Sequence, residues 1–138
     1  MTLFDWGSKT YLMGILNATP DSFSDDGIHQ DVDLMISRGI EMLSRGADVL
    51  DVGGESSKPP SVYGHVNKVS EDEEIQRVVP IIRALSLESK AVISIDTYKA
   101  KVAKAAILAG ARMVNDIWGL GRDSEMAHLI ADTEVYVV

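Results

Sequence analysis

The sequence predicts an α/β fold in which parallel strands alternate with helices. Short apolar segments alternate along the chain with segments whose apolar residues recur at helical spacing. The apolar segments are continuous, as in AVISI at residues 91–95, which is typical of strands buried on both faces of a parallel sheet. Cap and turn residues separate these segments, so each helix would carry the chain from one strand to a parallel neighbour.

Five strands are expected along the chain. They are placed at residues 11–16, 47–54, 91–95, 111–117 and 134–138. The first helix is expected to begin at Asp31 as its N-cap and to stop near Gly46. Two later helices are predicted over residues 98–109, ended by Gly110, and over 123–131.

The helix between the second and third strands has the clearest start signal. Ser70 and Glu73 form a capping box, and the acids around them lie at the positive end of the helix dipole. Apolar residues at helical spacing continue as far as Leu85. Pro80 falls inside this pattern and is expected to kink the helix or to divide it in two.

Two architectures fit this alternation: an open doubly wound sheet and part of an eight-stranded barrel. No glycine-rich phosphate loop follows the first strand, which counts against a nucleotide-binding open sheet. An eight-stranded barrel usually takes about 250 residues, so this chain would supply about four and a half of its β/α units. A small, complete five-stranded domain is a third possibility, and the pattern alone does not decide among them.

Composition excludes several classes of function. The 138 residues are 46% hydrophobic and 25% charged, as expected for one globular domain with a core. No apolar run approaches the roughly 20 residues that span a bilayer, and the N-terminal segment does not resemble a signal peptide. The net charge of −8 argues against nonspecific binding of nucleic acid or anionic membranes. We therefore expect a soluble, cytoplasmic domain.

Polar residues stand where the strands end. Asn17 ends the first strand, Glu55 follows the second, Asp96 ends the third and Asn115 ends the fourth. Because the carboxyl ends of parallel strands form one rim, where active sites are built, these side chains are expected to share one face.

Each of these residues also has a purely structural interpretation. Asp96 and its neighbour Thr97 would cap the following helix, and the pair Asn115–Asp116 would form an Asx turn. Glu55 would pair with Lys58 in a solvated loop. For any one of these residues alone, the structural role is the better explanation. Polar residues at the ends of four successive strands, however, favour a binding or catalytic site.

The residue types that the sequence lacks exclude several kinds of site. The chain has no cysteine, no Gly-x-Ser-x-Gly motif and no cluster of acids and histidines at the spacing of a transition-metal site. Mg²⁺ is compatible, because it needs only one or two protein oxygens when substrate phosphates supply others.

Four motifs, in this order and spacing, resemble the dihydropteroate synthase family of folate biosynthesis: LNATPDSFSDDG, DVGGESSKP, ISIDTYKAKVA and VNDIWG. The resemblance implies a TIM (β/α)₈ barrel, of which residues 1–138 would be the N-terminal portion of a single pterin-binding domain. Members of this family, the targets of sulfonamides, are Mg²⁺-dependent transferases. They join 6-hydroxymethyl-7,8-dihydropterin diphosphate to p-aminobenzoate and release pyrophosphate, which leaves before the amine attacks.

The resemblance also implies roles for particular residues. Asn17 matches an Asn that contacts Mg²⁺, and Asp96 and Asn115 match pterin-binding groups. Ser57 stands where the family usually has a Thr that contacts the diphosphate substrate. The segments 18–27 and 56–68 would close over the site. The residues implied for the p-aminobenzoate pocket and its loop are Phe23, Ser57, Lys58 and Pro59.

Two residues depart from the family pattern. Lys58 occupies a position where the family has an Arg, so the two parallel hydrogen bonds that a guanidinium can donate are lost. Pro60 occupies a position where the family has a Gly, and it stiffens the segment. Lys58→Arg is therefore expected to change the affinity for p-aminobenzoate more than the affinity for pterin.

The family's remaining substrate groups have no counterpart in these residues. We therefore expect the chain to be the N-terminal portion of a longer, homodimeric enzyme and to be inactive alone. Two alternatives stay open. The methyltetrahydrofolate-binding domain of corrinoid methyltransferases shares the barrel, but it does not need the TPDSFSD segment. A non-catalytic half-barrel pterin-binding module would be completed by self-association.

Overall fold

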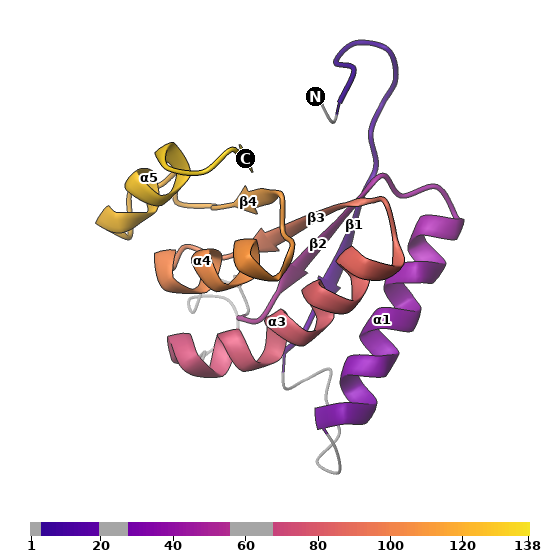
Figure 1. Cartoon of the computed structure of the whole chain (residues 1–138), viewed down its shortest axis with the longest axis horizontal. Helices are drawn as coiled ribbons and strands as arrows, with labels where there is room; N and C mark the ends of the chain where they lie inside the picture. The colour runs from indigo at the N-terminus through magenta and orange to yellow at the C-terminus, as the bar shows by residue number, and fades with distance from the viewer. Residues whose placement is uncertain (1–3, 20–27, 56–67) are drawn as a thin grey trace, which may run out of the picture.

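A computed structural model of the chain describes residues 4–19, 28–55 and 68–138. Their five parallel strands form one sheet in which each strand lies beside the next in sequence (Figure 1). The strands are β1 (Met13–Asn17), β2 (Val49–Gly53), β3 (Val92–Asp96), β4 (Met113–Asn115) and β5 (Tyr136–Val137). The helices are α1 (Ile28–Ser44), α3 (Glu71–Glu88), α4 (Ala100–Ala109) and α5 (Ser124–Ala131). This order has no switch point, so the doubly wound alternative is wrong and the strands are arranged as in an α/β barrel.

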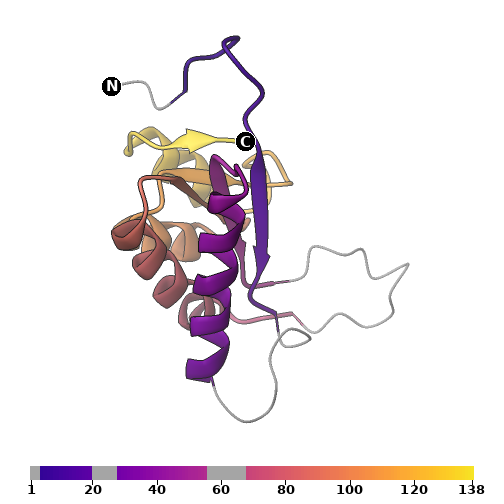
Figure 2. The ribbon, with the colours of Figure 1, turned by 90° about the vertical axis from the view of Figure 1, so that its right-hand side faces the viewer.

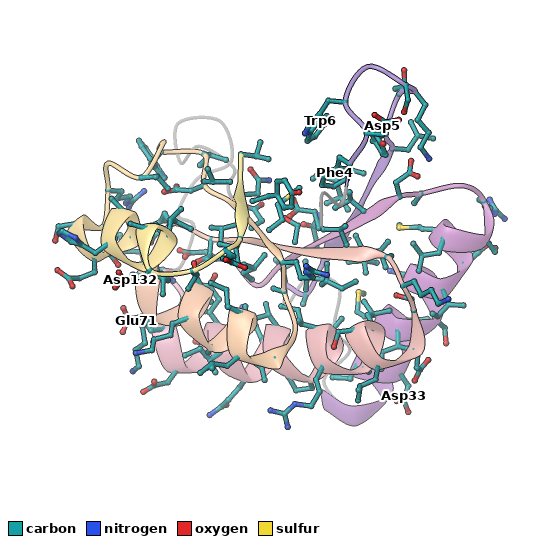
Figure 3. All side chains as sticks on the ribbon, turned by 45° about the horizontal axis from the view of Figure 1, so that its top comes forward. Phe4, Asp5, Trp6, Asp33, Glu71 and Asp132 are labelled. Atoms are coloured by element: carbon teal, nitrogen blue, oxygen red, sulfur yellow. The ribbon has the colours of Figure 1, made fainter. Side chains whose placement is uncertain are left out.

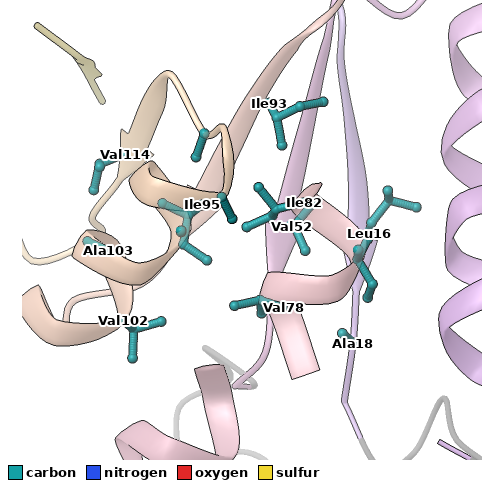
Figure 4. Packing of buried hydrophobic residues seen from close by; sticks show 14 of the residues in the cluster. Leu16, Ala18, Val52, Val78, Ile82, Ile93, Ile95, Val102, Ala103 and Val114 are labelled. Carbon is teal, nitrogen blue, oxygen red and sulfur yellow. The ribbon is translucent and has the colours of Figure 1, made fainter. Parts of the chain in front are cut away.

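The helices cover one face of the sheet (Figure 2). Alternate strand residues, among them Leu16, Val52 and Ile95, are buried in a single apolar cluster with residues of α3 and α4 such as Ile82 and Ala103 (Figure 4). A doubly wound sheet would bury both faces under helices, whereas a barrel carries helices on the outside only.

The opposite face of the sheet is closed at its amino end by the segment before β1. Phe4 is 4% exposed and packs on Val49, Val92 and Met113, the inward-facing residues of three strands. Its ring centroid lies 4.8 Å from that of Trp6 (Figure 3). The carboxyl end of this face is left to polar residues.

Helix starts follow the sequence prediction in one case and not in another. Ser70 Oγ accepts a hydrogen bond from the Glu73 backbone N–H at 3.2 Å, which confirms the N-cap of α3. The prediction of Asp31 as an N-cap is wrong, because α1 already begins at Ile28. Asp31 stands in the first turn of the helix instead.

Pro80 does not divide α3, which runs unbroken from Glu71 to Glu88. Pro80 is exposed, so the carbonyl that loses its helical hydrogen bond lies on the solvent side of the helix. Gly110 ends α4 with φ of 118°, as predicted. None of the helices in the described ranges is long and apolar enough to cross a membrane.

Candidate active site at the carboxyl rim

The carboxyl ends of four strands form a continuous row of residues. Asn17 pairs in register with Gly53, Gly53 with Asp96, and Asp96 with Asn115. These positions alternate with buried core residues such as Leu16 and Ile95, so they lie on the face opposite the helices. The prediction that Asn17, Asp96 and Asn115 share one rim is therefore confirmed.

Asn17 presents an exposed amide at the edge of this row. Across the described residues, no group of three or more His, Cys, Asp or Glu side chains could hold a metal ion. A single accessible amide oxygen nevertheless fits Mg²⁺, which takes few protein ligands and completes its shell with water and phosphate. Among the described residues, the rim therefore offers such a metal one amide oxygen, and water and a phosphorylated ligand would supply the other ligands.

Asp96 is the acid of this row, and its surroundings shift its pKa. Burial raises its pKa to about 6, and the nearby carboxylates of Asp51, Glu74 and Asp116 add to the rise. The interpretation of Asp96 as a helix cap is wrong, because three residues separate it from the first residue of α4. The first N–H of α4, that of Ala100, donates instead to Asp123 Oδ2 at 2.8 Å.

Asn115 is held by a residue that the sequence analysis missed. Its Nδ2 donates to Asp51 Oδ2 at 2.9 Å. Asp51 is 3% exposed and lies in the middle of β2, two positions before the rim. The sequence contained a signal for this role: an acid in the interior of an apolar strand is expected to be buried, and a buried carboxylate needs a hydrogen-bond partner.

Asp116, next to Asn115, has a structural role. It is 3% exposed, and its two carboxylate oxygens accept hydrogen bonds from the backbone N–H groups of Trp118 and Leu120, both at 2.9 Å. The predicted Asx turn is thus confirmed for Asp116, while Asn115 is left to face the rim.

Behind the rim lies a buried ionic cluster of Lys99, Glu55 and Glu74. Lys99 Nζ is 2.6 Å from a carboxylate oxygen of each acid and donates to the Val69 carbonyl at 2.7 Å. Burial lowers the pKa of Lys99, but its hydrogen bonds with Glu55 and Glu74 outweigh this and raise it overall. Burial raises the pKa of Glu74 despite Lys99. The predicted solvated role of Glu55 is wrong, because its side chain is packed against Lys99.

A hollow of about 540 Å³ opens beside this cluster, between the N-termini of α3 and α5. Arg122 lies over the ring of Tyr98, with 4.1 Å from its guanidinium carbon to the ring centroid. None of the row residues Asn17, Gly53, Asp96 and Asn115 lines this hollow. The predicted loop residues Phe23, Ser57, Lys58 and Pro59 all lie outside the described residues.

Comparison with known proteins identifies the family to which this chain belongs. Residues 13–138 match the family described as pterin binding enzyme. The chain belongs to this family. It is 53% identical over 132 residues to the dihydropteroate synthase of Clostridium beijerinckii, covering 96% of this chain and 47% of that protein. It is 47% identical over 130 residues to the Bacillus subtilis dihydropteroate synthase, covering 94% and 44%.

Solved structures agree with these relatives. A dihydropteroate synthase from Clostridium difficile in the presence of pteroic acid superposes with a TM-score of 0.88 at 49% identity, over 97% of this chain and 49% of that one. The Xanthomonas albilineans enzyme with 4-aminobenzoic acid gives 0.84 at 39% identity, over 99% and 47%. The described strands are thus part of a TIM barrel, and the chain spans about half the length of the relatives it matches.

Proposed function

We propose that this protein acts as a dihydropteroate synthase. It would condense 6-hydroxymethyl-7,8-dihydropterin diphosphate with p-aminobenzoate to give 7,8-dihydropteroate and pyrophosphate. The observation that carries the proposal is the row of Asn17, Gly53, Asp96 and Asn115 on the inward rim of a chain from the pterin-binding family. A relative determined in the presence of pteroic acid, which joins a pterin to p-aminobenzoate, and one determined with 4-aminobenzoic acid support these two substrate classes.

Asp96 and Asn115 would bind the pterin ring. The Asn115 amide offers both a donor and an acceptor, and Asp96 accepts a ring N–H when it is ionised. Gly53 lies beside Asp96 on the neighbouring strand β2, and a Cβ there would be in van der Waals contact with Asp96, 3.5 Å from its Cβ. A side chain at this position would occupy the inward face beside Asp96, so glycine leaves this space open for a flat ring.

The reaction needs positioning more than side-chain chemistry. The C–O bond between the pterin methylene and the diphosphate breaks, a C–N bond to the arylamine forms, and the amine loses one proton to solvent. No side-chain nucleophile is required, and the site contributes orientation and charge stabilisation. Bound Mg²⁺ would neutralise charge on the departing diphosphate. Asn17 would supply an amide oxygen to hold it.

The other substrate contacts rest on the family resemblance. Ser57 would contact the diphosphate, and the p-aminobenzoate pocket would take Phe23, Ser57, Lys58 and Pro59. Because the described strands provide only one part of a barrel, we expect no turnover from the 138-residue chain alone. Homodimerisation of the whole enzyme stays a prediction.

The test uses the protein expressed from its complete reading frame, with both substrates and Mg²⁺. We expect dihydropteroate and pyrophosphate to form together, to disappear with EDTA and to return with added Mg²⁺. Asp96→Asn should lower kcat/KM by about tenfold or more, the value of one hydrogen bond to a charged group. Asp48→Asn, at the opposite end of the same sheet, is the matched control and should leave kcat/KM near the wild-type value.

The outcomes separate the proposal from its alternatives. Pterin binding without turnover, in a stable self-associated form, would favour a non-catalytic module. Binding of methyltetrahydrofolate in preference to the pterin diphosphate would favour the methyltransferase domain. Absence of any pterin binding would overturn the proposal.

A further inference from the structure

Asp51 and Asn115 join two strands that are not neighbours. Asp51 lies in β2 and Asn115 in β4, with β3 between them in the sheet. Their hydrogen bond, Nδ2 to Oδ2 at 2.9 Å, connects residues 64 positions apart and runs along the inward face. Asp51 is one layer deeper than Asn115, because it pairs in register with Ser94, two residues before the rim residue Asp96.

This contact dictates which way the Asn115 amide faces. An ionised carboxylate only accepts hydrogen bonds, so the NH₂ group of Asn115, and not its carbonyl oxygen, must face Asp51. One N–H of the amide is used in this bond. The carbonyl oxygen and the second N–H remain for a ligand at the rim.

In the layer of residues beneath the rim, as far as the structure describes the chain, two buried polar side chains have hydrogen-bonding atoms without a partner. Among the described residues, neither the second carboxylate oxygen of Asp51 nor the Ser94 hydroxyl has a hydrogen-bond partner. Both residues are almost fully buried, at 3% and 0% exposed. Buried polar atoms of this kind are costly unless a partner reaches them. Their position on the inward face is consistent with a partner that enters from the barrel interior.

We propose that Asp51 is a positioning residue for pterin recognition, which fixes the Asn115 amide so that its free oxygen and N–H meet the aminopyrimidinone edge of the ring. The inference rests on the proposed function and deepens it. The 2-amino group of a pterin donates and the adjacent ring nitrogen accepts, so an amide of fixed orientation matches this pair of groups. An amide free to turn over would accept the reversed pattern as well.

The competing explanation is that the bond only ties β2 to β4. Loss of the hydrogen bond would lower the stability of the protein under either explanation. Only if the bond orients the Asn115 amide would its loss also change the selectivity for the ligand. The deciding quantity is therefore the ratio of affinities for 6-hydroxymethylpterin and its 2-oxo analogue, 6-hydroxymethyllumazine, which replaces the amino donor by an acceptor.

The experiment measures both affinities by calorimetry for the protein expressed from its complete reading frame and for Asp51→Asn and Asp51→Ala. In Asp51→Asn the new amide can either accept from Asn115 or donate to it, so the orientation is no longer dictated. We expect the preference for the pterin to fall by about tenfold in Asp51→Asn and at least as much in Asp51→Ala. Asp48→Asn, just before the same strand, should keep the wild-type preference.

Each result has a definite meaning. Variants that unfold more easily than wild type but keep its pterin-to-lumazine ratio overturn the inference and leave the proposed function intact. If Asp51→Ala does not fold, the near-isosteric Asp51→Asn decides by the same ratio. A wild-type protein that binds neither compound overturns the proposed function, and the inference with it.

Discussion

At the scale of single residues, Asp96 carries a carboxyl group whose ionisation opposes folding. Burial of its carboxylate raises its pKa from 3.8 to about 6, and the neighbouring carboxylates of Asp51, Glu74 and Asp116 add to the rise. The folded state therefore holds a proton on Asp96 at pH values where the unfolded chain has lost it. An acid in this position costs free energy at neutral pH and is expected where a ligand, rather than the fold, uses it.

The pH dependence of stability follows from this shift. Because the folded pKa lies above the unfolded value, the Asp96 contribution to the free energy of unfolding falls as the pH rises from about 4 to 6 and is flat above 6. Asp96→Asn removes this dependence. We expect the variant to be more stable than wild type at pH 7 by about 1 kcal/mol, after discounting the shift for solvent screening.

Urea unfolding of both proteins between pH 4 and 7.5 checks this prediction. The two free energies should diverge as the pH rises, since the advantage of the variant develops while Asp96 ionises. A constant difference across this range would show that Asp96 is not the titrating group.

At the scale of secondary-structure elements, Lys99 holds together parts of the chain that local sequence does not connect. It precedes α4 and meets Glu74 of α3, Glu55 after β2 and the Val69 carbonyl. Lys99→Met would leave the two acids close together without a counter-charge. We expect the free energy of unfolding to fall by about 3 kcal/mol or more, as for other buried pairs that lose one partner.

Denaturant unfolding measures this loss, and Lys101→Met is the matched control. Lys101 pairs with Asp72 on the exposed surface, where salt bridges contribute little. An equal effect of the two substitutions would contradict the assignment of Lys99 to a buried cluster.

Gly39 sets how closely α1 approaches the sheet. A Cβ at this position would lie 2.9 Å from Leu85 Cδ2 and 3.2 Å from a methyl carbon of both Leu16 and Leu50. Gly39→Ala gains about 1 kcal/mol of helix propensity but overpacks a filled core, which usually costs about 1–3 kcal/mol. We expect a net destabilisation of about 1 kcal/mol by thermal or urea unfolding. Ser37→Ala, exposed on the same helix, should not destabilise, and a stabilised Gly39→Ala would show that α1 can move away.

At the scale of the whole molecule, the two faces of the sheet have different coverings. The outer face is packed under helices, while on the inner face Ile15 is 60% exposed. Phe4 covers the amino end of that inner face, where Val49, Val92 and Met113 meet. The N-terminal segment therefore acts as the base of the barrel below the polar rim.

Phe4→Ala should lower the free energy of unfolding by about 3 kcal/mol or more, as expected when a buried aromatic side chain is removed. Trp6→Ala is the comparison, because Trp6 is 68% exposed and its loss should cost about 1 kcal/mol or less. Urea unfolding at neutral pH measures both. Similar losses for the two variants would indicate that the segment contributes only through contacts between its aromatic rings.

The sequence by itself determined the strands, most helix ends and the rim positions of Asn17, Asp96 and Asn115. These depend on local periodicity, on caps such as Ser70 and on the alternation of strand and helix, all of which are properties of nearby residues. Where local signals were ambiguous, as for Asp31 at the start of α1, the prediction failed by a few residues.

Only the tertiary structure decided which polar groups meet. Asp51 contacts Asn115 across 64 residues, Lys99 contacts Glu74 across 25, and Asp123 caps α4 across 23. It also decided between a barrel and a doubly wound sheet, because both have the same alternation and differ in strand order. The physical reason is common to these cases: periodicity shows which face of an element is apolar, whereas the partner of a buried charge depends on which strands become neighbours.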